Sequence, residues 1–176
     1  MERLASDLIE LSTRQNFPDR LSGGEVLRGW ARSASGDTAN GISWIENGIK
    51  DTRAAGAMVG APFSLALKAE ALHLAGRTGE ALEAIREADT LVERSEARWW
   101  CAELQRLRGV FLAAMGADEA QIEASFCAAM RIAKEQKAVS LEKRSEATYA
   151  EYRRQKVNPS GGRESDYLFA RWNQKS

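Results

Sequence analysis

Three segments of the sequence align without gaps at a fixed offset of 40 residues: LRGWARSASG at 27–36, LKAEALHLAG at 67–76 and LRGVFLAAMG at 107–116. Each segment begins with Leu, has a basic residue in second place and ends with Gly. A period between about 20 and 50 residues is typical of proteins built from stacked structural repeats. The sequence therefore predicts a chain of similar units that bury their apolar faces against one another.

The repeating unit is expected to be a pair of helices joined by a tight turn. Gly36, Gly76 and Gly116 close the three segments, and glycine ends a helix in the left-handed conformation without steric cost. Asp37 or Thr38, Thr78 and Asp118 follow as candidate N-caps, and Asp118 with Gln121 matches a capping box. Apolar residues recur at steps of three and four, as in an amphipathic helix. We expect helices near 2–15, 18–35, 38–55, 61–75, 79–94, 97–115, 118–136 and 138–155.

Composition excludes several classes of function. Lys and Arg number 25, Asp and Glu also number 25, and this zero net charge predicts no nucleic-acid partner. No apolar run approaches the ~18 residues of a membrane span, and the charged N-terminus does not resemble a signal peptide, so we expect a cytoplasmic protein without a membrane partner. Cys101 and Cys127 lack metal-ligand spacing, so we expect reduced thiols, no metal and no cofactor.

The segments resemble tetratricopeptide repeats. That family places a small residue in the first helix of each pair, a Gly at the turn, and small, bulky and small residues in the second helix. The first small position is filled here by Gly29, Ala69 and Gly109. The second-helix positions are Gly41, Ile45 and Gly48, then Ala81, Ile85 and Ala88, then Ile122, Phe126 and Ala129. The resemblance implies an all-α fold, an α-α superhelix (solenoid) of antiparallel helix pairs with a 40-residue period.

The period is longer than the ~34 residues usual for the family. It is similar to the longer-helix repeats of bacterial signalling proteins. More narrowly, ERSEARWWCAELQRLRG and ATYAEYRRQK resemble the C-terminal repeat region of bacterial adenylate/guanylate cyclase-type proteins, where such repeats follow a catalytic and an ATPase domain. We expect a repeat domain over 1–156 and a C-terminal tail over 157–176. In that tail, the aromatic cluster around Phe169 is expected to fold back on the last helix or to dock on a second chain.

The resemblance implies a concave groove lined by the first helices of the pairs, which receives a protein or peptide partner. The positions that match the lining of the groove in the family are Val26, Trp30, Ser33, Phe63, Glu70, His73, Glu103, Arg106 and Val110. They form a mixed apolar and charged set. The expected function is a non-catalytic protein-interaction module, a regulatory remnant of a cyclase-type signalling protein. The alternative is a peptide or small-ligand sensor that uses the same groove.

Other signals in the sequence favour simpler interpretations. LSGG at 21–24 matches the signature of ATP-binding cassette proteins, but the sequence holds no GxxxxGK[ST] stretch to bind the phosphates, so we expect a helix entry there. His73, the only histidine, is predicted to be a surface or groove residue, and no catalytic set is expected. Trp99 and Trp100 are adjacent, so one of them should be at least partly exposed. The first helix lacks a partner helix before it, which predicts a cover from an upstream domain or from a homodimer through exposed terminal repeats.

Overall fold

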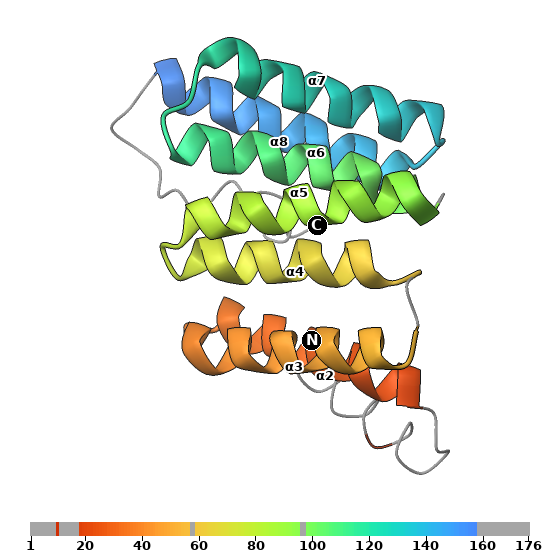
Figure 1. The fold of residues 1–176 in the computed structure, drawn as a ribbon. Coiled ribbons are helices and arrows are strands. Elements are labelled where there is room, and N and C mark those ends of the chain that lie inside the picture. Colours follow the sequence, from red (N-terminus) through yellow and green to blue (C-terminus); the bar gives the residue numbers. More distant parts are fainter. Residues whose placement is uncertain (1–9, 11–17, 57–58, 96–97, 158–176) are drawn as a thin grey trace. The chain divides into compact units, whose positions relative to one another are not determined.

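The computed structural model describes residues 10, 18–56, 59–95 and 98–157, and every regular element in those ranges is helical (Figure 1). The expectation of an all-α fold is confirmed for this part of the chain. None of the described helices has the length and apolarity needed to span a bilayer. The expected helix over 2–15, apart from the helical Glu10, and the tail after Val157 lie outside the described residues.

The chain divides into two compact units, Met1–Ala97 and Arg98–Ser176. In the first unit the described helices are α2 (Pro18–Ala34), α3 (Thr38–Ala54), α4 (Ala61–Leu74) and α5 (Thr78–Ser95). In the second unit they are the 3₁₀ turn η1 (Arg98–Trp100), α6 (Cys101–Ala114), α7 (Glu119–Glu135) and α8 (Val139–Val157). Each of these helices begins and ends within a few residues of its predicted bounds, and the 3₁₀ turn replaces the expected first turn of α6.

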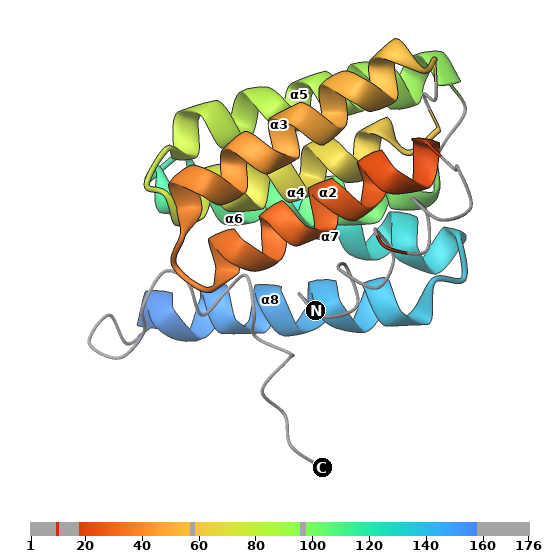
Figure 2. The same cartoon turned by 90° about the horizontal axis from the view of Figure 1, so that it is seen from below.

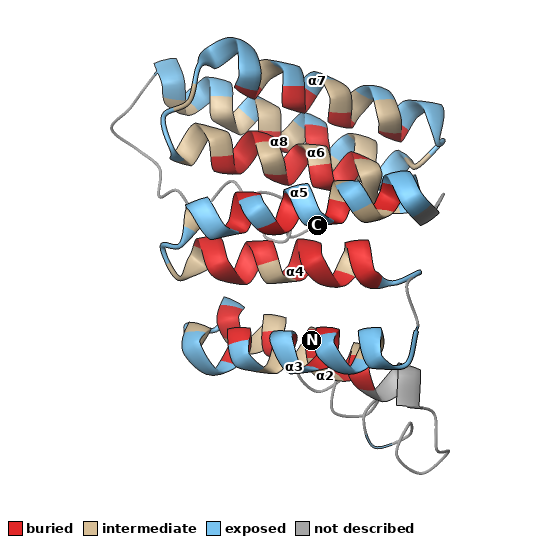
Figure 3. Ribbon diagram, in the orientation of Figure 1, coloured by how far each residue is buried: buried red, intermediate tan, exposed pale blue. Residues whose placement is uncertain are grey.

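Within each unit, helices that follow one another in sequence pack as antiparallel pairs. The pairs are α2 with α3, α4 with α5 and α6 with α7, and the first of them can be followed side by side in Figures 1 and 2. Helix α4 also packs against α2 and α3, and α8 packs against α6 and α7. In each unit, therefore, one helix contacts both members of the preceding pair. The apolar sequence of α4 suits this central position, because α4 is buried along most of its length (Figure 3).

Glycine ends the first helix of each pair, as the sequence predicts. Helices α2, α4 and α6 end at Ala34, Leu74 and Ala114, which are 40 residues apart. Two residues later Gly36, Gly76 and Gly116 have φ values of 105°, 75° and 65°. In the α4–α5 turn the Gly76 N–H donates to the His73 carbonyl and the Arg77 N–H to the Leu72 carbonyl, both at 2.9 Å. These are the two hydrogen bonds of the Schellman motif.

Two predicted N-caps, Asp37 and Asp118, occupy N-cap positions without side-chain capping bonds, and a third, Thr78, is the first residue of α5. Asp37 and Asp118 are the N-cap residues of α3 and α7, and neither makes a side-chain bond to the free amides of its helix. The Asp37 carboxylate instead accepts hydrogen bonds from Arg32 Nη1 at 3.2 Å and Asn40 Nδ2 at 2.9 Å. At Asp118 the backbone carbonyl accepts from the Gln121 N–H at 3.1 Å. The capping-box prediction for Asp118 and Gln121 is therefore wrong.

Paired helices approach closely at the predicted small residues. A Cβ atom added to Gly41 would lie 2.1 Å from Ser33 Oγ and 2.5 Å from the Gly29 carbonyl oxygen. One added to Gly109 would lie 2.9 Å from the ring of Phe126. Real Cβ atoms do not approach their neighbours this closely, so only glycine permits the observed helix spacing. All members of the predicted small and bulky sets are buried: Gly29, Ala69, Gly109, Gly41, Ile45, Gly48, Ala81, Ile85, Ala88, Ile122, Phe126 and Ala129.

Candidate functional site

The side chains predicted to line a groove are mostly buried. Seven of the nine have less than a tenth of their surface exposed: Val26, Ser33, Glu70, His73, Glu103, Arg106 and Val110. Trp30 and Phe63 have intermediate exposure. The polar members of the set are engaged in the contacts described below. The exposed large apolar side chains of the second unit are, among the described residues, Trp99, Met115, Val139 and Val157.

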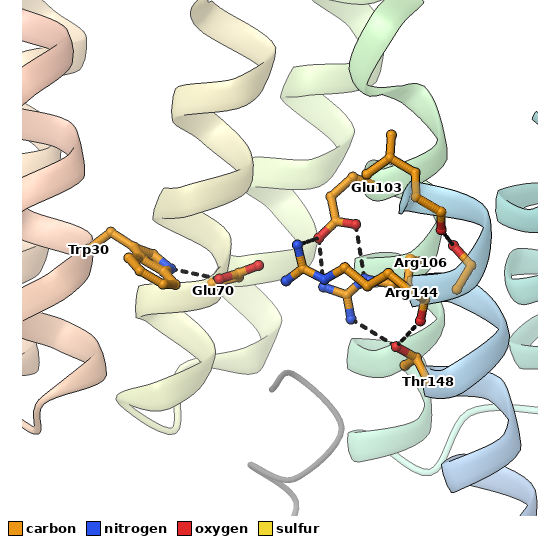
Figure 4. Close-up of polar contacts among 8 residues, drawn as sticks. Trp30, Glu70, Glu103, Arg106, Arg144 and Thr148 are labelled. Atoms are coloured by element: carbon orange, nitrogen blue, oxygen red, sulfur yellow. Dashed lines mark hydrogen bonds and ion pairs between the residues drawn. The ribbon is translucent and has the colours of Figure 1, made fainter. Parts of the chain in front are cut away.

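In the first unit, Trp30 of α2 and Glu70 of α4 are joined by a hydrogen bond. The Trp30 indole Nε1–H donates to Glu70 Oε2 at 2.6 Å (Figure 4). The two residues are equivalent positions of successive repeats, since they are 40 residues apart. Glu70 is 3% exposed, and a hydrogen bond to a buried carboxylate is stronger than one between neutral groups. This contact fixes how α2 lies along α4.

His73, which was predicted to be a surface or groove residue, is not on the surface. It is buried near the end of α4, and its Nδ1 lies 3.0 Å from Thr78 Oγ1, the first residue of α5. The contact links the two sides of the α4–α5 turn. Thr78, predicted as an N-cap, is thus held by an imidazole from the preceding helix.

The second unit contains a buried cluster of charged and hydroxyl groups, which we call the α6–α8 cluster: Glu103, Arg106, Arg144 and Thr148. On α6, Arg106 donates to both carboxylate oxygens of Glu103, from Nε at 3.0 Å and from Nη2 at 2.7 Å (Figure 4). From α8, Arg144 Nη1 lies 3.1 Å from Glu103 Oε1, and Thr148 Oγ1 accepts from Arg106 Nη1 at 3.3 Å. Glu103 and Arg106 are fully buried or nearly so. These contacts between α8 and α6 are made by polar groups and not by apolar side chains.

Burial and charge act on Glu103 in opposite directions. Burial raises the pKa of the Glu103 carboxyl and is the largest single effect. The charge of Arg106, its hydrogen bonds and the charge of Arg144 together outweigh it, so the pKa lies below the usual value. Glu103 is accordingly ionised in the folded protein at neutral pH, with two guanidinium groups to compensate its charge.

The lowered pKa of Glu103 predicts a loss of stability in acid. A carboxyl with a lower pKa in the folded state than in the unfolded state stabilises the fold above the unfolded pKa, and this contribution disappears as the pH falls through the folded pKa. Urea unfolding of the wild type and of Glu103→Gln from pH 7 to 3 should therefore give curves that converge below about pH 4. Glu146→Gln, at an exposed position of α8, should stay within about 0.5 kcal/mol of the wild type. A constant difference between wild type and Glu103→Gln across this range would contradict the account.

Sequence reasoning identified two members of the α6–α8 cluster and missed the other two. Arg144 follows Glu103 by 41 residues and Thr148 follows Arg106 by 42 residues, close to the repeat period. A search for charge-complementary pairs at about one period would have found Arg144, whereas Thr148 is uncharged and would have been missed. Trp99 is exposed and Trp100 has intermediate exposure, which confirms that the two adjacent rings do not share one environment.

The described polar contacts join neighbouring helices within each unit. Among residues 10, 18–56, 59–95 and 98–157, no group of three or more His, Cys, Asp or Glu side chains could hold a metal ion. Cys101 has intermediate exposure, Cys127 is exposed, and both are free thiols.

The chain is 33% identical over 145 residues to an uncharacterized protein of Rhizobium meliloti (strain 1021), a match that covers 78% of this chain. The chain spans only 14% of the length of that protein. No protein-family model and no solved structure matches the chain.

Proposed function

We propose that the chain is a tetratricopeptide-like repeat module, an α-α superhelix that binds a protein or peptide partner and carries out no covalent step itself. The observation that carries the proposal is the recurrence of one helix pair at a 40-residue spacing, with close contacts at Gly29, Gly41 and Gly109. Stacked helix pairs of this kind present extended surfaces rather than enclosed chambers, and extended surfaces suit recognition of helices or peptides.

The place of the module in a larger protein is also a proposal. The Rhizobium meliloti relative is several times longer than the segment it shares with this chain, as expected if the segment is one part of a multidomain protein. Together with the resemblance of 93–109 to cyclase-type proteins, this supports a regulatory role next to a catalytic domain, in the cytoplasm. A homodimer through exposed terminal repeats is one way in which the outer face of a terminal repeat would be buried.

Phe63 and Trp30 are the positions of the predicted groove through which we expect a partner to be recognised. Both keep partial exposure while the other predicted groove residues are buried. Phe63 is the better probe, because Trp30 also holds Glu70 and its loss would disturb the fold. Half-exposed aromatic side chains are enriched at the centres of protein interfaces.

The test is a quantitative affinity capture from cells that produce the protein, with three baits: wild type, Phe63→Ala and Trp99→Ala. Trp99 is the matched control, an exposed aromatic residue outside the predicted groove. The proposal expects a protein that binds the wild type and Trp99→Ala but binds Phe63→Ala at least about tenfold more weakly, a loss of roughly 1.4 kcal/mol. Circular dichroism must show that all three baits are folded. Equal capture by Phe63→Ala would contradict this surface.

The second candidate is a sensor of small ligands, favoured by the juxtaposition of an indole and a carboxylate at Trp30 and Glu70. A ligand that binds only the folded protein raises the melting temperature in proportion to the logarithm of its concentration. A metabolite that does so for the wild type but not for Trp30→Phe would favour the sensor over the protein-interaction module.

A further inference from the structure

The turn between α7 and α8 contains no glycine, unlike the α2–α3, α4–α5 and α6–α7 turns. It is closed by the same two hydrogen bonds, from the Lys137 N–H to the Lys134 carbonyl at 3.0 Å and from the Ala138 N–H to the Ala133 carbonyl at 2.9 Å. Lys137 takes the left-handed position, with φ of 55°, and no other described residue except glycine has a positive φ. A side chain with a Cβ atom disfavours this conformation by roughly tenfold. The hairpin formed by α7 and α8 therefore retains backbone strain at Lys137.

The same residues are well suited to a continuous helix. The sequence across the turn is Glu135, Gln136, Lys137 and Ala138, all of which are strong helix formers. Glycine occupies the corresponding place after α2, α4 and α6 and disfavours continuation there. Straightening the α7–α8 turn would relieve the strain at Lys137 and join 119–157 into one helix.

Helix α8 packs on α6 through polar side chains and on α7 through the rings of Tyr149 and Tyr152 against Phe126. The fully buried side chains of α8 are Ser145 and Thr148, and its contact with α6 runs through the α6–α8 cluster. Departure of α8 removes Arg144 from Glu103 and Thr148 from Arg106. A buried carboxylate and guanidinium left without these contacts would be costly, so the vacated face requires an equivalent polar helix.

We propose that two copies of the chain exchange α8 to form a swapped dimer. In it, α7 and α8 of each chain form one continuous helix, and each α8 occupies the place on α6 and α7 of the second copy. A second copy is the occupant that restores every contact of α8 with α6 and α7, since it supplies Arg144 and Thr148 at the same spacing. The proposal rests on residues 98–157 alone and does not depend on the proposed function.

The exchange converts known contacts within a chain into contacts between chains. Lys156 of α8 forms an ion pair with Glu119 at the start of α7, and both side chains are about half exposed. A carbodiimide joins such an amine and carboxylate directly. In the monomer this cross-link lies within one chain, whereas in the swapped dimer it joins two chains. The position of the cross-link therefore distinguishes an exchange of α8 from association through any other surface.

The experiment compares the full chain in three forms after unfolding and refolding at high protein concentration: wild type, Lys137→Gly and Gln136→Gly. Glycine at 137 removes the strain of the hairpin and weakens the continuous helix, so it favours the monomer. Gln136 is in the right-handed conformation in the hairpin, with φ of −79°, and would stay right-handed in the continuous helix, so glycine there costs both forms about equally and relieves no strain. Its bond to the Arg98 carbonyl is lost equally in both forms.

We expect the wild type to form a dimer by light scattering, with Lys156 and Glu119 cross-linked between chains. Lys137→Gly should lower the association constant at least about thirtyfold, because each dimer contains two hinges. Gln136→Gly should dimerise within a few-fold of the wild type. A wild type that stays monomeric at every concentration, a dimer whose Lys156–Glu119 cross-link stays within one chain, or equal dimerisation of Lys137→Gly would each overturn the proposal.

Discussion

Gly41→Ala should lower the free energy of unfolding by about 3 kcal/mol, at the upper end of the usual range for overpacked positions. The new Cβ would lie 2.5 Å from the Gly29 carbonyl oxygen and 2.8 Å from the Ser33 amide nitrogen, both backbone atoms of α2. A rotamer change cannot remove these two clashes, so α2 and α3 must separate. The measurement is urea unfolding followed by circular dichroism, with the midpoint and the slope reported separately.

Gly79→Ala is the matched control for Gly41→Ala. It is the same substitution in a helix of the same unit, and an added Cβ at Gly79 meets no atom within 4 Å. Alanine has the higher helix propensity, so this variant should be equal to or more stable than the wild type by up to about 1 kcal/mol. If both variants were equally stable, α2 and α3 would not be in contact at Gly41.

Arg106→Met should destabilise the protein by about 3 to 5 kcal/mol. Methionine fills much of the volume of the arginine side chain but leaves the Glu103 carboxylate buried with only Arg144 as a charged partner. Thr148 Oγ1 also loses the donor Arg106 Nη1. The loss should be measured by chemical unfolding at pH 7, where Glu103 is ionised.

The double variant Glu103→Leu with Arg106→Met separates the burial of a charge from loss of packing. Replacement of a whole buried ion pair by apolar side chains is often close to neutral, whereas removal of one partner is not. We expect the double variant to be more stable than Arg106→Met alone. Additive losses from the two single substitutions would mean that Glu103 and Arg106 do not act as a pair.

The regular part of the fold could be predicted from the sequence because its signals are local. Glycines at 36, 76 and 116 mark helix ends, since a left-handed residue is needed there. Gly29 and Gly41 occur where helix backbones touch, and Gly109 occurs where the Phe126 ring packs, so the requirement at all three depends on size alone. The 40-residue offset predicts that the first helices of the pairs end 40 residues apart, and the ends of α2, α4 and α6 confirm this spacing.

The environment of the candidate site could not be predicted in the same way. Whether Glu70 or Arg106 faces solvent depends on contacts with residues far away in the sequence. Charged residues occur on both buried and exposed helix faces, so residue type alone does not predict their burial. The α6–α8 cluster is an example, since its interacting residues on α6 and α8 are 41 and 42 positions apart in the sequence. The left-handed Lys137 was also missed, because no glycine marks that turn.

The most direct test of the repeated helix pair is nuclear Overhauser spectroscopy of the labelled protein. Paired helices in contact at glycine predict cross-peaks between the α-protons of Gly29 and those of Gly41, and between the α-protons of Gly109 and the ring of Phe126. Helical chemical shifts over 38–54 and 119–135 without either cross-peak would show that the helices form but do not pair as described, and the account of the fold would be wrong.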